Sequence, residues 1–322
     1  MEDIKTKEYV VGIDVGGQTT KIGIVNRRGE IVKQSVISSM FGTGEAGLFE
    51  DAVCEAIKSL LAQAGLSAEQ IQGIGMGAPD ANYYEGTIHD AVNLAWAKGI
   101  TVPIASDIEK RINIPVTVTN DANAAAIGEM TYGAARGMKD FIMITLGTGV
   151  GSGIVVNGSL VYGHDGFAGE LGHTKIIRNG GRQCGCGQCG CLEAYTSAIG
   201  IARTAREWLE MSDEPSQLRN LSEITSKDIF VAAENGDKLA VKIFEYTGRL
   251  LGESFANFIP FSAPEAIVLF GGLARAWKYI EKPILDAMNS NVVFLWKNKV
   301  RLIHSTLPES DAAILGASAL AW

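Results

Sequence analysis

A hairpin made of an apolar strand, a glycine-rich turn and a second apolar strand occurs twice in this chain, at a domain-sized spacing. The first copy covers Val10–Val25 around the turn Asp14-Val-Gly-Gly17, and the second covers Phe141–Val156 around Gly147-Thr-Gly-Val-Gly151. Apolar runs bounded by such turns are typical of strands. The repetition predicts a duplicated fold of two domains, with a ligand between the halves.

Strands and helices alternate along the rest of the chain. Further strands are expected at 71–76, 115–119 and 266–270, and helices at 49–64, 122–132, 192–211, 239–258 and 312–322. The polar stretch 212–227 predicts a loop. Alternating βα segments of this kind imply a mixed α/β sheet.

Length and charge bound the class of protein. The chain has 322 residues, enough for two domains, and its net charge of −8 argues against nucleic acid as a partner. The first residues are too charged for a secretory signal, and no apolar run approaches the roughly 20 residues that span a bilayer. We therefore expect a cytoplasmic protein with no membrane partner.

Four of the five cysteines lie within the block Cys184-Gly-Cys-Gly-Gln-Cys-Gly-Cys191, with His173 upstream and Glu170 and Glu193 on either side. Buried cysteines are normally scattered singly, so the clustering favours a tetrahedral zinc site. A disulfide, or an iron–sulfur cluster held by all four cysteines, is the alternative. A structural zinc ion would shape the loop and fix the two glutamates in position.

Three glycine turns follow strands: Asp14–Gly17, Gly147–Gly151 and Gly271-Gly272. Their backbone N–H groups suit phosphate binding, although each taken singly could be a plain turn. None has the spacing of a P-loop or of a dinucleotide fingerprint. Asp14 could hold Mg²⁺ through water or could cap its own turn.

Asn120 and Asp121 follow the expected strand 115–119 directly. Both residue types are preferred helix N-caps, which is one interpretation. The other is catalytic, because a carboxylate at a strand end can accept a proton from a sugar hydroxyl during phosphate transfer. The residues alone leave both interpretations open.

Together these motifs resemble the ROK family of sugar kinases and sugar-responsive repressors, within the actin/hexokinase/Hsp70-like ATPase superfamily. The resemblance covers nearly the whole chain, and the pattern from Glu170-Leu-Gly-His173 through the cysteine block to Glu193 is highly specific. It implies an α/β, two-domain actin-like (ribonuclease H-like) fold with an interdomain cleft and a zinc-stabilised loop. The implied domains are 1–119 plus a terminal helix at about 306–322, and 120–305.

The resemblance also implies a role for each matching residue. Asp121 would be the general base, and Cys189 falls on a variable position outside the metal site. The structural zinc would be held by His173, Cys184, Cys186 and Cys191. The sugar would be contacted by Asn120, Glu170, His173, Glu193, Gly77 and Asn93. ATP with Mg²⁺ would be bound by Asp14, Gly16, Gly17, Gln18, Thr19, Thr20, Gly147, Thr148, Gly149, Gly271 and Gly272.

One position departs from the family pattern. Gln18 takes the place of the threonine in the usual Asp-x-Gly-Gly-Thr motif, which removes a hydroxyl from the first phosphate turn. Thr19 and Thr20 follow directly, and the Gln18 amide could donate instead.

The function implied by the resemblance is ATP-dependent phosphorylation of a hexose, with glucose as the expected substrate and a homodimer as the expected assembly. Kinases for N-acetylmannosamine, N-acetylglucosamine, fructose, mannose or allose share the motifs, and polyphosphate could replace ATP. A non-catalytic sugar-binding regulator is the alternative of another class. Repressors of the family carry an N-terminal helix-turn-helix domain, for which a first strand at about Tyr9 is expected to leave no room.

Overall fold

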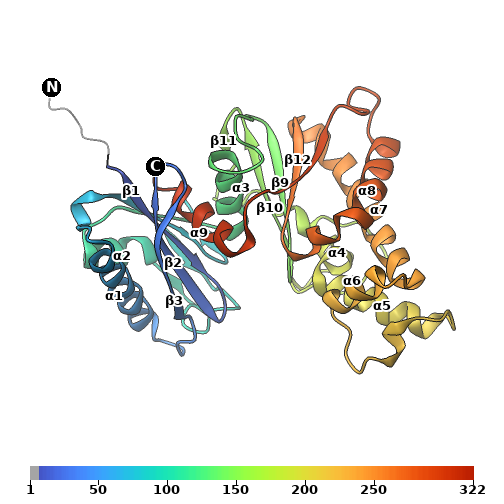
Figure 1. Ribbon diagram of the computed structural model, residues 1–322, viewed down its shortest axis with the longest axis horizontal. Helices are drawn as coiled ribbons and strands as arrows, with labels where there is room; N and C mark the ends of the chain where they lie inside the picture. The colour runs from blue at the N-terminus through green and yellow to red at the C-terminus, as the bar shows by residue number, and fades with distance from the viewer. Residues whose placement is uncertain (1–6) are drawn as a thin grey trace. The chain divides into compact units, whose positions relative to one another are not determined.

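The computed structural model describes residues 7–322, which form two compact units (Figure 1). The first unit holds residues 7–137, 160–168 and 306–322, and the second holds 138–159 and 169–305. Each unit is built on a five-stranded sheet. The α/β architecture with two mixed sheets confirms the predicted fold class.

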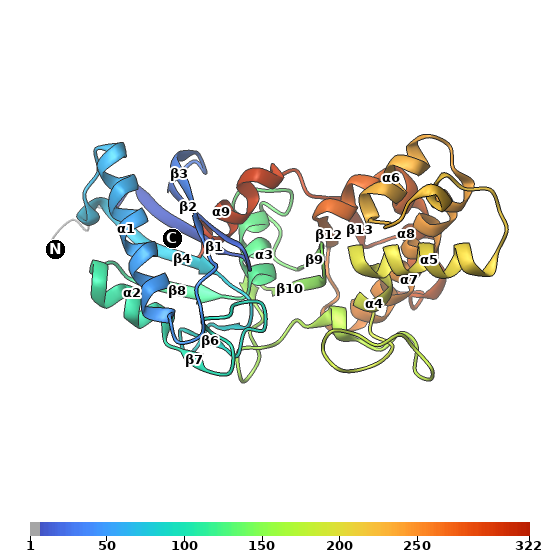
Figure 2. The same ribbon diagram turned by 90° about the horizontal axis from the view of Figure 1, so that it is seen from below.

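The sheet of the first unit has the strand order β3-β2-β1-β4-β8. Its first three strands are antiparallel, and the last two run parallel to β1. Helices α1 and α2 cover one face and α3 and α9 the other (Figure 2). The bounds are β1 Tyr9–Val15, β2 Thr19–Asn26, β3 Ile31–Ser38, β4 Ile71–Gly77, β8 Val116–Thr119, α1 Ala46–Ala64, α2 Ile104–Ile112, α3 Asp121–Thr131 and α9 Glu309–Ala319. A small second sheet joins β5 Ala81–Asn82, β6 Thr87–His89 and β7 Thr101–Val102.

Helix α9 packs directly onto the backbone of the sheet at three glycines that lie side by side. Gly12 of β1 pairs with Gly23 of β2 and with Gly75 of β4. A Cβ at Gly23 would come within 2.6 Å of Ile314, and one at Gly12 or Gly75 would overlap a carbonyl oxygen of α9. The absence of side chains at these positions therefore sets how closely the terminal helix approaches the sheet.

We predict that Gly75→Ala lowers the free energy of unfolding by about 3 kcal/mol, because the new methyl group would meet helix backbone that cannot move aside. Chemical denaturation measures the change. Gly47→Ala is the matched control: in α1 an added Cβ meets only the flexible end of Arg111, at 3.8 Å. That variant should be neutral or slightly more stable. Equal destabilisation by the two variants would contradict the prediction.

The second unit repeats this sheet topology. Its order is β11-β10-β9-β12-β13, again with antiparallel β9 and β10 followed by two parallel neighbours. The strands are β9 Phe141–Leu146, β10 Val150–Val156, β11 Ser159–Leu160, β12 Ala266–Phe270 and β13 Arg301–His304. The helices that share its core are α5 Ala198–Met211, α6 Ser226–Glu234, α7 Lys238–Ser262 and α8 Trp277–Asn291, and the short α4 Glu193–Thr196 contacts α5 and α7. The predicted duplication is visible in the equivalent strand orders.

The helix expected over 192–211 is divided into α4 and α5. Ser197 separates them, and its hydroxyl accepts a hydrogen bond from the Gly200 N–H, so it caps α5. The expected loop 212–227 contains the short turn Gln217–Asn220 and the first residues of α6. Thr225 caps α6 through a reciprocal bond with Asp228, a capping-box pattern with Asp in place of the usual Glu.

The compact units divide the chain differently from the predicted domain borders. Residues 120–137 and 160–168 group with the first unit. Helix α3 packs tightly on α9, where a Cβ at Gly128 would come within 2.7 Å of Gly316. The domain borders suggested by the family resemblance therefore remain a prediction.

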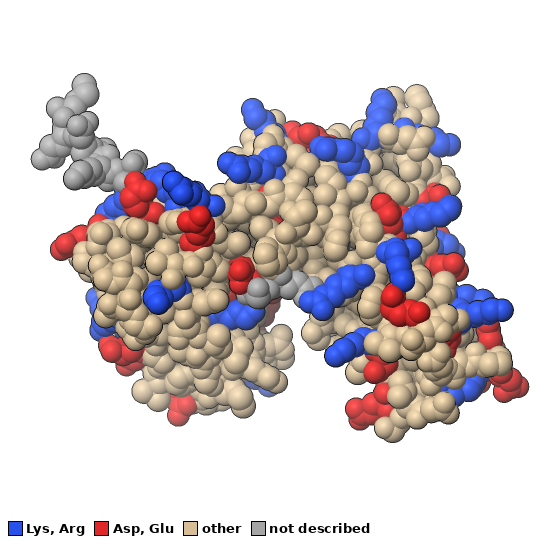
Figure 3. Space-filling view, viewed as in Figure 1, with Lys and Arg blue, Asp and Glu red and all other residues tan. Residues whose placement is uncertain are grey.

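Charged side chains of both signs are interspersed on the face shown in Figure 3. Within residues 7–322, no helix is long and apolar enough to cross a membrane.

Candidate functional site

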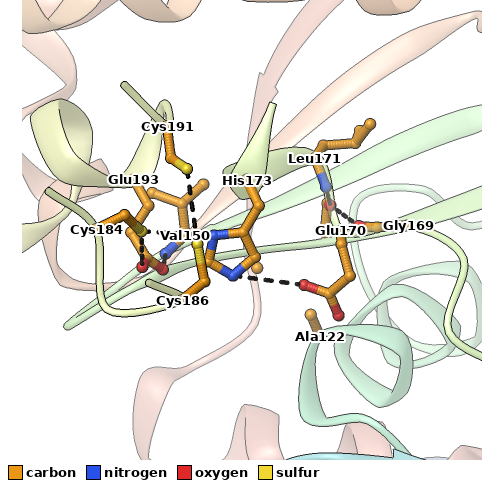
Figure 4. Close-up of polar contacts among 12 residues, drawn as sticks. Ala122, Val150, Gly169, Glu170, Leu171, His173, Cys184, Cys186, Cys191 and Glu193 are labelled. Atoms are coloured by element: carbon orange, nitrogen blue, oxygen red, sulfur yellow. Dashed lines mark hydrogen bonds and ion pairs between the residues drawn. The ribbon is translucent and has the colours of Figure 1, made fainter. Parts of the chain in front are cut away.

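Four sulfur and imidazole groups meet in the second unit. His173 ends a short 3-10 turn, Leu171–His173, and the cysteines lie on a loop closed by bridges of Lys175 to Cys191 and Gln183 to Cys189. Ligand atoms of His173, Cys184, Cys186 and Cys191 all lie within 4.8 Å of one another. Figure 4 shows these side chains pointing toward a common centre.

The spacing of these atoms fits a tetrahedral zinc ion. Bonds of about 2.3 Å to sulfur and about 2.0–2.1 Å to nitrogen place two sulfurs roughly 3.8 Å apart and a sulfur and a nitrogen roughly 3.6 Å apart. The Sγ atoms of Cys186 and Cys191 are 3.7 Å apart, and Cys184 Sγ lies 3.6 Å from His173 Nδ1. Four protein ligands would close the site, so the metal would have a structural role.

Cys189 lies outside this group, although it shares the loop. Among the described residues, the four-ligand cluster contains the other three cysteines of the block, and the Cys189 side chain is exposed. This is the ligand set that the family resemblance implies. No pair of described cysteines forms a disulfide, since all five are free.

Arg182 anchors the cysteine loop, and the sequence analysis missed it. Its guanidinium is almost fully buried, lies over the ring of Tyr195, and pairs with Glu207 at 2.5 Å. It also donates to the carbonyl oxygens of Ala194 and Gly200. Its position two residues before Cys184 was the only sequence signal that it belongs to the metal loop. An arginine in a polar loop is normally expected to be exposed, so its burial could not be predicted.

His173 presents different nitrogens to the two sides. Nδ1 faces Cys184, whereas Nε2 lies 3.9 Å from a carboxylate oxygen of Glu170. A histidine that binds a metal through one nitrogen can donate through the other, because the metal fixes its tautomer. The ring can therefore connect the metal loop to a polar group outside it.

Glu193 joins the cysteine loop to the glycine turn after β9. One carboxylate oxygen accepts the Val150 N–H at 2.9 Å, and the other is 3.3 Å from Cys184 Sγ. A Cβ at Gly149 would come within 2.5 Å of this carboxylate, so a side chain there would displace it. Within the turn, the Gly147 N–H donates to the Gly149 carbonyl, and Thr148 is exposed.

The third glycine turn follows β12. Gly271 has a φ of 102°, in the region that favours glycine, and a Cβ there would come within 2.5 Å of the Leu146 carbonyl oxygen. Gly272 begins the short turn Gly272–Ala276 before α8. The ends of β9 and β12 are thus held in close contact.

Asn120 and Asp121 occupy the start of α3 in the first unit. Asn120 is the N-cap, and its side chain accepts the Ala122 N–H at 2.9 Å. One oxygen of Asp121 accepts the same N–H at 2.7 Å, and solvent still reaches this side chain. Gly77 lies against it, since a Cβ there would be 3.5 Å from the Asp121 Cα.

Desolvation raises the pKa of three carboxyl groups in the first unit, and the charge of Asp121 adds to the effect on two of them. Desolvation by the surrounding protein, followed by the charge of Asp121, raises the pKa of Asp14 to about 6 against the opposing effect of Lys21. Desolvation also raises the pKa of Asp121 itself. The pKa of Asp80 is raised by partial burial and then by Asp121 and Asp90. Raised carboxyl pKa values are typical of functional sites.

The polar residues beside Gln18 in the first glycine turn differ in how far they are exposed. Thr20 is buried and its hydroxyl bonds to Ser39 at 2.7 Å, so it does not replace the missing hydroxyl. Gln18 and Thr19 are exposed at the turn. Asn93 lies beside Gly17, where a Cβ would come within 3.2 Å of its carbonyl oxygen.

The structure thus collects the expected site residues into two sets, one in each unit. The first unit holds Asp14, Gly16, Gly17, Gln18, Thr19, Thr20, Gly77, Asn93, Asn120 and Asp121. The second unit holds Gly147, Thr148, Gly149, Glu170, His173, Cys184, Cys186, Cys191, Glu193, Gly271 and Gly272.

Comparison with known proteins decides the family. The model of the ROK family matches residues 10–322. The chain belongs to the ROK family.

Proteins similar to this chain include glucokinases and a repressor. A glucokinase from Halalkalibacterium halodurans is 39% identical over 86% of this chain and 84% of its own. The structure of a Streptomyces griseus ROK glucokinase in complex with glucose and AMPPNP is 30% identical, covers 97% of this chain and 98% of its own, and has a TM-score of 0.78. A xylose repressor from Bacillus subtilis is 27% identical over 98% of this chain and 77% of its own.

We predict that Cys186→Ser abolishes zinc retention, because it removes one of four ligands. Zinc bound after dialysis is measured by elemental analysis. Cys189→Ser is the matched control from the same exposed loop, and it should retain zinc like the unaltered protein. Zinc loss from the control and not from Cys186→Ser would contradict the ligand set.

The raised pKa of Asp14 predicts a pH-dependent cost to stability. The Asp14 carboxyl has a pKa of 3.8 in the unfolded chain and about 6 in the folded protein, so the folded state binds its proton more tightly. The contribution of this proton to the free energy of unfolding is complete below pH 3.8 and is lost as pH rises through 6. Asp14→Asn removes this loss. Relative to the unaltered protein, the variant should gain stability as pH rises from 3.8 through about 6, by at most about 3 kcal/mol, and should keep this gain at higher pH. Denaturation without nucleotide or Mg²⁺ measures this; a pH-independent difference would contradict it.

Proposed function

We propose that this ROK protein is an ATP-dependent hexose kinase that converts glucose to glucose 6-phosphate. The observation that carries the proposal is the Asp121 carboxylate, which solvent reaches at the start of α3 while the surrounding protein raises its pKa. A general base is most effective when its pKa lies near the pH at which the enzyme works, and a raised pKa brings a carboxylate closer to that pH. The similarity to ROK glucokinases supports glucose as the substrate.

In this proposal Asp121 orients the attacking sugar hydroxyl, most simply the one on C6, and accepts its proton as the phosphoryl group transfers. Asn120 holds the backbone at the start of α3 by capping it. Phosphoryl transfer depends mainly on positioning and charge stabilisation, so the fixed geometry of this helix start contributes directly.

Other groups bind the two substrates. The turns Asp14–Gly17, Gly147–Gly149 and Gly271-Gly272 offer backbone N–H groups to ATP, and Gln18 and Thr19 add exposed polar side chains. Mg²⁺, when bound, would neutralise phosphate charge, with Asp14 contacting it through water. Glu170, His173, Glu193, Gly77 and Asn93 would contact the sugar.

Zinc, when bound, would supply structural support and no chemical step. Glu193 lies two residues after the ligand Cys191 and accepts the Val150 N–H, so the metal loop would hold this carboxylate beside the glycine turn. His173 would be oriented in the same way through Nδ1. We also propose that the protein acts in the cytoplasm as a homodimer, as the family resemblance implies.

A sugar-binding regulator is the second candidate, favoured by the similarity to a xylose repressor. Kinases for other hexoses or N-acetylhexosamines, and polyphosphate as phosphoryl donor, remain within the first candidate. A panel of hexoses and N-acetylhexosamines tested with ATP and with polyphosphate separates these cases. Sugar binding without turnover for any combination would favour the regulator.

We predict that Asp121→Asn lowers kcat by a factor on the order of 10²–10⁴ and leaves the dissociation constant for glucose nearly unchanged, because it removes a proton acceptor without changing shape. ADP release and calorimetric titration measure the two quantities. Asp213→Asn, on an exposed loop, is the control and should keep full activity. Near-normal turnover of Asp121→Asn would remove Asp121 from the role of base.

A further inference from the structure

Residues 160–168 follow β11 but group with the first unit, where they pack beside the short strand β5. The Asn82 amide of β5 donates a hydrogen bond to the Asp165 carbonyl oxygen at 2.6 Å. Gly166 has a φ of 90°, and a Cβ there would come within 2.7 Å of the Asn82 side chain. This segment is therefore in close contact with the first unit.

A cluster of three tyrosines joins the segment to the turn after β5. The ring of Tyr162 stacks on that of Tyr83, with centroids 4.0 Å apart and an angle of 8° between the planes. The ring of Tyr84 meets Tyr162 edge-on at 6.0 Å, and the Tyr84 hydroxyl donates to the Gly163 carbonyl oxygen at 2.9 Å. Aromatic pairs prefer stacked and edge-to-face arrangements of this kind. The ring of Tyr162 is therefore held from two sides.

The hydroxyl of Tyr162 reaches the end of β8, a strand that β5 contacts. Thr119 is the last residue of β8 and is 1% exposed, and its side chain is hydrogen-bonded to Tyr162. Burial raises the pKa of Tyr162 and the charges of Tyr83 and Tyr84 add to the effect, whereas the bond with Thr119 lowers this pKa. The surroundings of Tyr162 thus keep its hydroxyl protonated.

Thr119 also contacts the first turn of α3. Asn123 donates from Nδ2 to the Thr119 hydroxyl at 3.4 Å and is 4% exposed. Within residues 7–322 no group donates to the Asn123 Oδ1, so the bond to Thr119 orients this buried amide. A threonine hydroxyl rotates to suit its partners, and linked hydrogen bonds reinforce one another. Tyr162, Thr119 and Asn123 therefore form one chain of polar contacts at the junction of β8 and α3.

Asp121 lies inside this junction. Thr119 comes two residues before it and Asn123 two residues after it. The cap formed by Asn120 fixes the backbone of the first helical turn. The polar chain from Tyr162 holds the same turn to the end of the strand. The direction of the Asp121 carboxylate therefore depends on both sets of contacts.

We propose that Tyr162 is a positioning residue for Asp121 and acts through the hydroxyl of Thr119. The inference rests on the proposed role of Asp121 as the base in sugar phosphorylation. The fixed ring of Tyr162 presents its hydroxyl to Thr119, which in turn holds Asn123 and the start of α3 in one orientation. A small displacement of a catalytic group lowers the rate steeply, because the reacting atoms must meet at about 3–3.5 Å.

Attachment of the segment alone does not account for the hydroxyl of Tyr162. The hydrogen bonds of Asn82 and Tyr84 already attach the segment, and stacking on Tyr83 needs only an aromatic ring. A phenylalanine at position 162 would serve that purpose equally well. The bond to Thr119 therefore indicates a separate task for the hydroxyl.

Steady-state kinetics of the full chain test the proposal. Tyr162→Phe keeps the ring and removes the hydroxyl, so it should lower kcat about 10-fold and leave KM for glucose and ATP nearly unchanged. Tyr84→Phe is the matched control from the same cluster, because it removes a hydroxyl that bonds to Gly163 and should keep full turnover. An unchanged kcat in Tyr162→Phe, or an equal loss in both variants, would overturn the proposal.

Replacement of Thr119 tests the middle of the polar chain. Thr119→Val should lower kcat at least as much as Tyr162→Phe, and adding Tyr162→Phe to it should cause little further loss, since both remove the same contact. Thr119→Ser keeps a hydroxyl and should restore the turnover that Thr119→Val loses. Additive losses in the double variant would contradict an action through Thr119.

The Asp121→Asn background separates positioning from general structural damage. If Tyr162 acts through the Asp121 carboxylate, adding Tyr162→Phe to Asp121→Asn should change the remaining kcat by less than about 2-fold. A further loss of about 10-fold in the double variant would mean that Tyr162 acts elsewhere, and would overturn the assignment.

Amide hydrogen exchange tests the positioning without sugar or nucleotide. The N–H groups of Ala122 and Ala124, at the start of α3, should exchange about 10-fold faster in Tyr162→Phe, and in Tyr84→Phe they should exchange as in the unaltered protein. Unchanged exchange in Tyr162→Phe would overturn the positioning even in an active kinase. Absence of turnover by the unaltered protein with every sugar and phosphoryl donor would instead refute the proposed function.

Discussion

Backbone packs directly against other groups at glycines in both units, and the candidate sites depend on this close packing. In the first unit, Gly12, Gly23 and Gly75 let α9 rest on the sheet. In the second unit, Gly149 leaves room for the Glu193 carboxylate, and Gly271 leaves room for the end of β9. A side chain at Gly12, Gly75 or Gly271 would meet backbone, and one at Gly149 would displace the Glu193 carboxylate.

The metal loop is held by two independent sets of interactions. Four ligand atoms gather at distances that suit zinc, and Arg182 fixes the start of the loop to α4 and α5 through buried hydrogen bonds and Glu207. Glu193 then connects the loop to the turn after β9. The metal ligands and the glycine turn are therefore connected through one short segment of chain.

Much of the fold could be predicted because its signals are local. Apolar runs ending in glycine identified both central hairpins, and the clustered cysteines with His173 favoured a metal site, whose four ligands the family resemblance implied. The division of one expected helix at Ser197, the beginning of α6 inside an expected loop, and the burial of Arg182 could not be predicted in this way. Each depends on capping or pairing with residues whose proximity is set by the folded chain.

The sequence by itself determined the duplicated α/β architecture and the residue types at the glycine turns, the start of α3 and the metal loop, because these follow from short-range patterns. The tertiary structure decided which groups are engaged with one another. It assigned the Thr20 hydroxyl to Ser39, gave Asp14 a raised pKa beside Asp121, and buried Arg182 against Tyr195 and Glu207. Burial and pairing between distant segments, which no local pattern specifies, are the physical reason for that division.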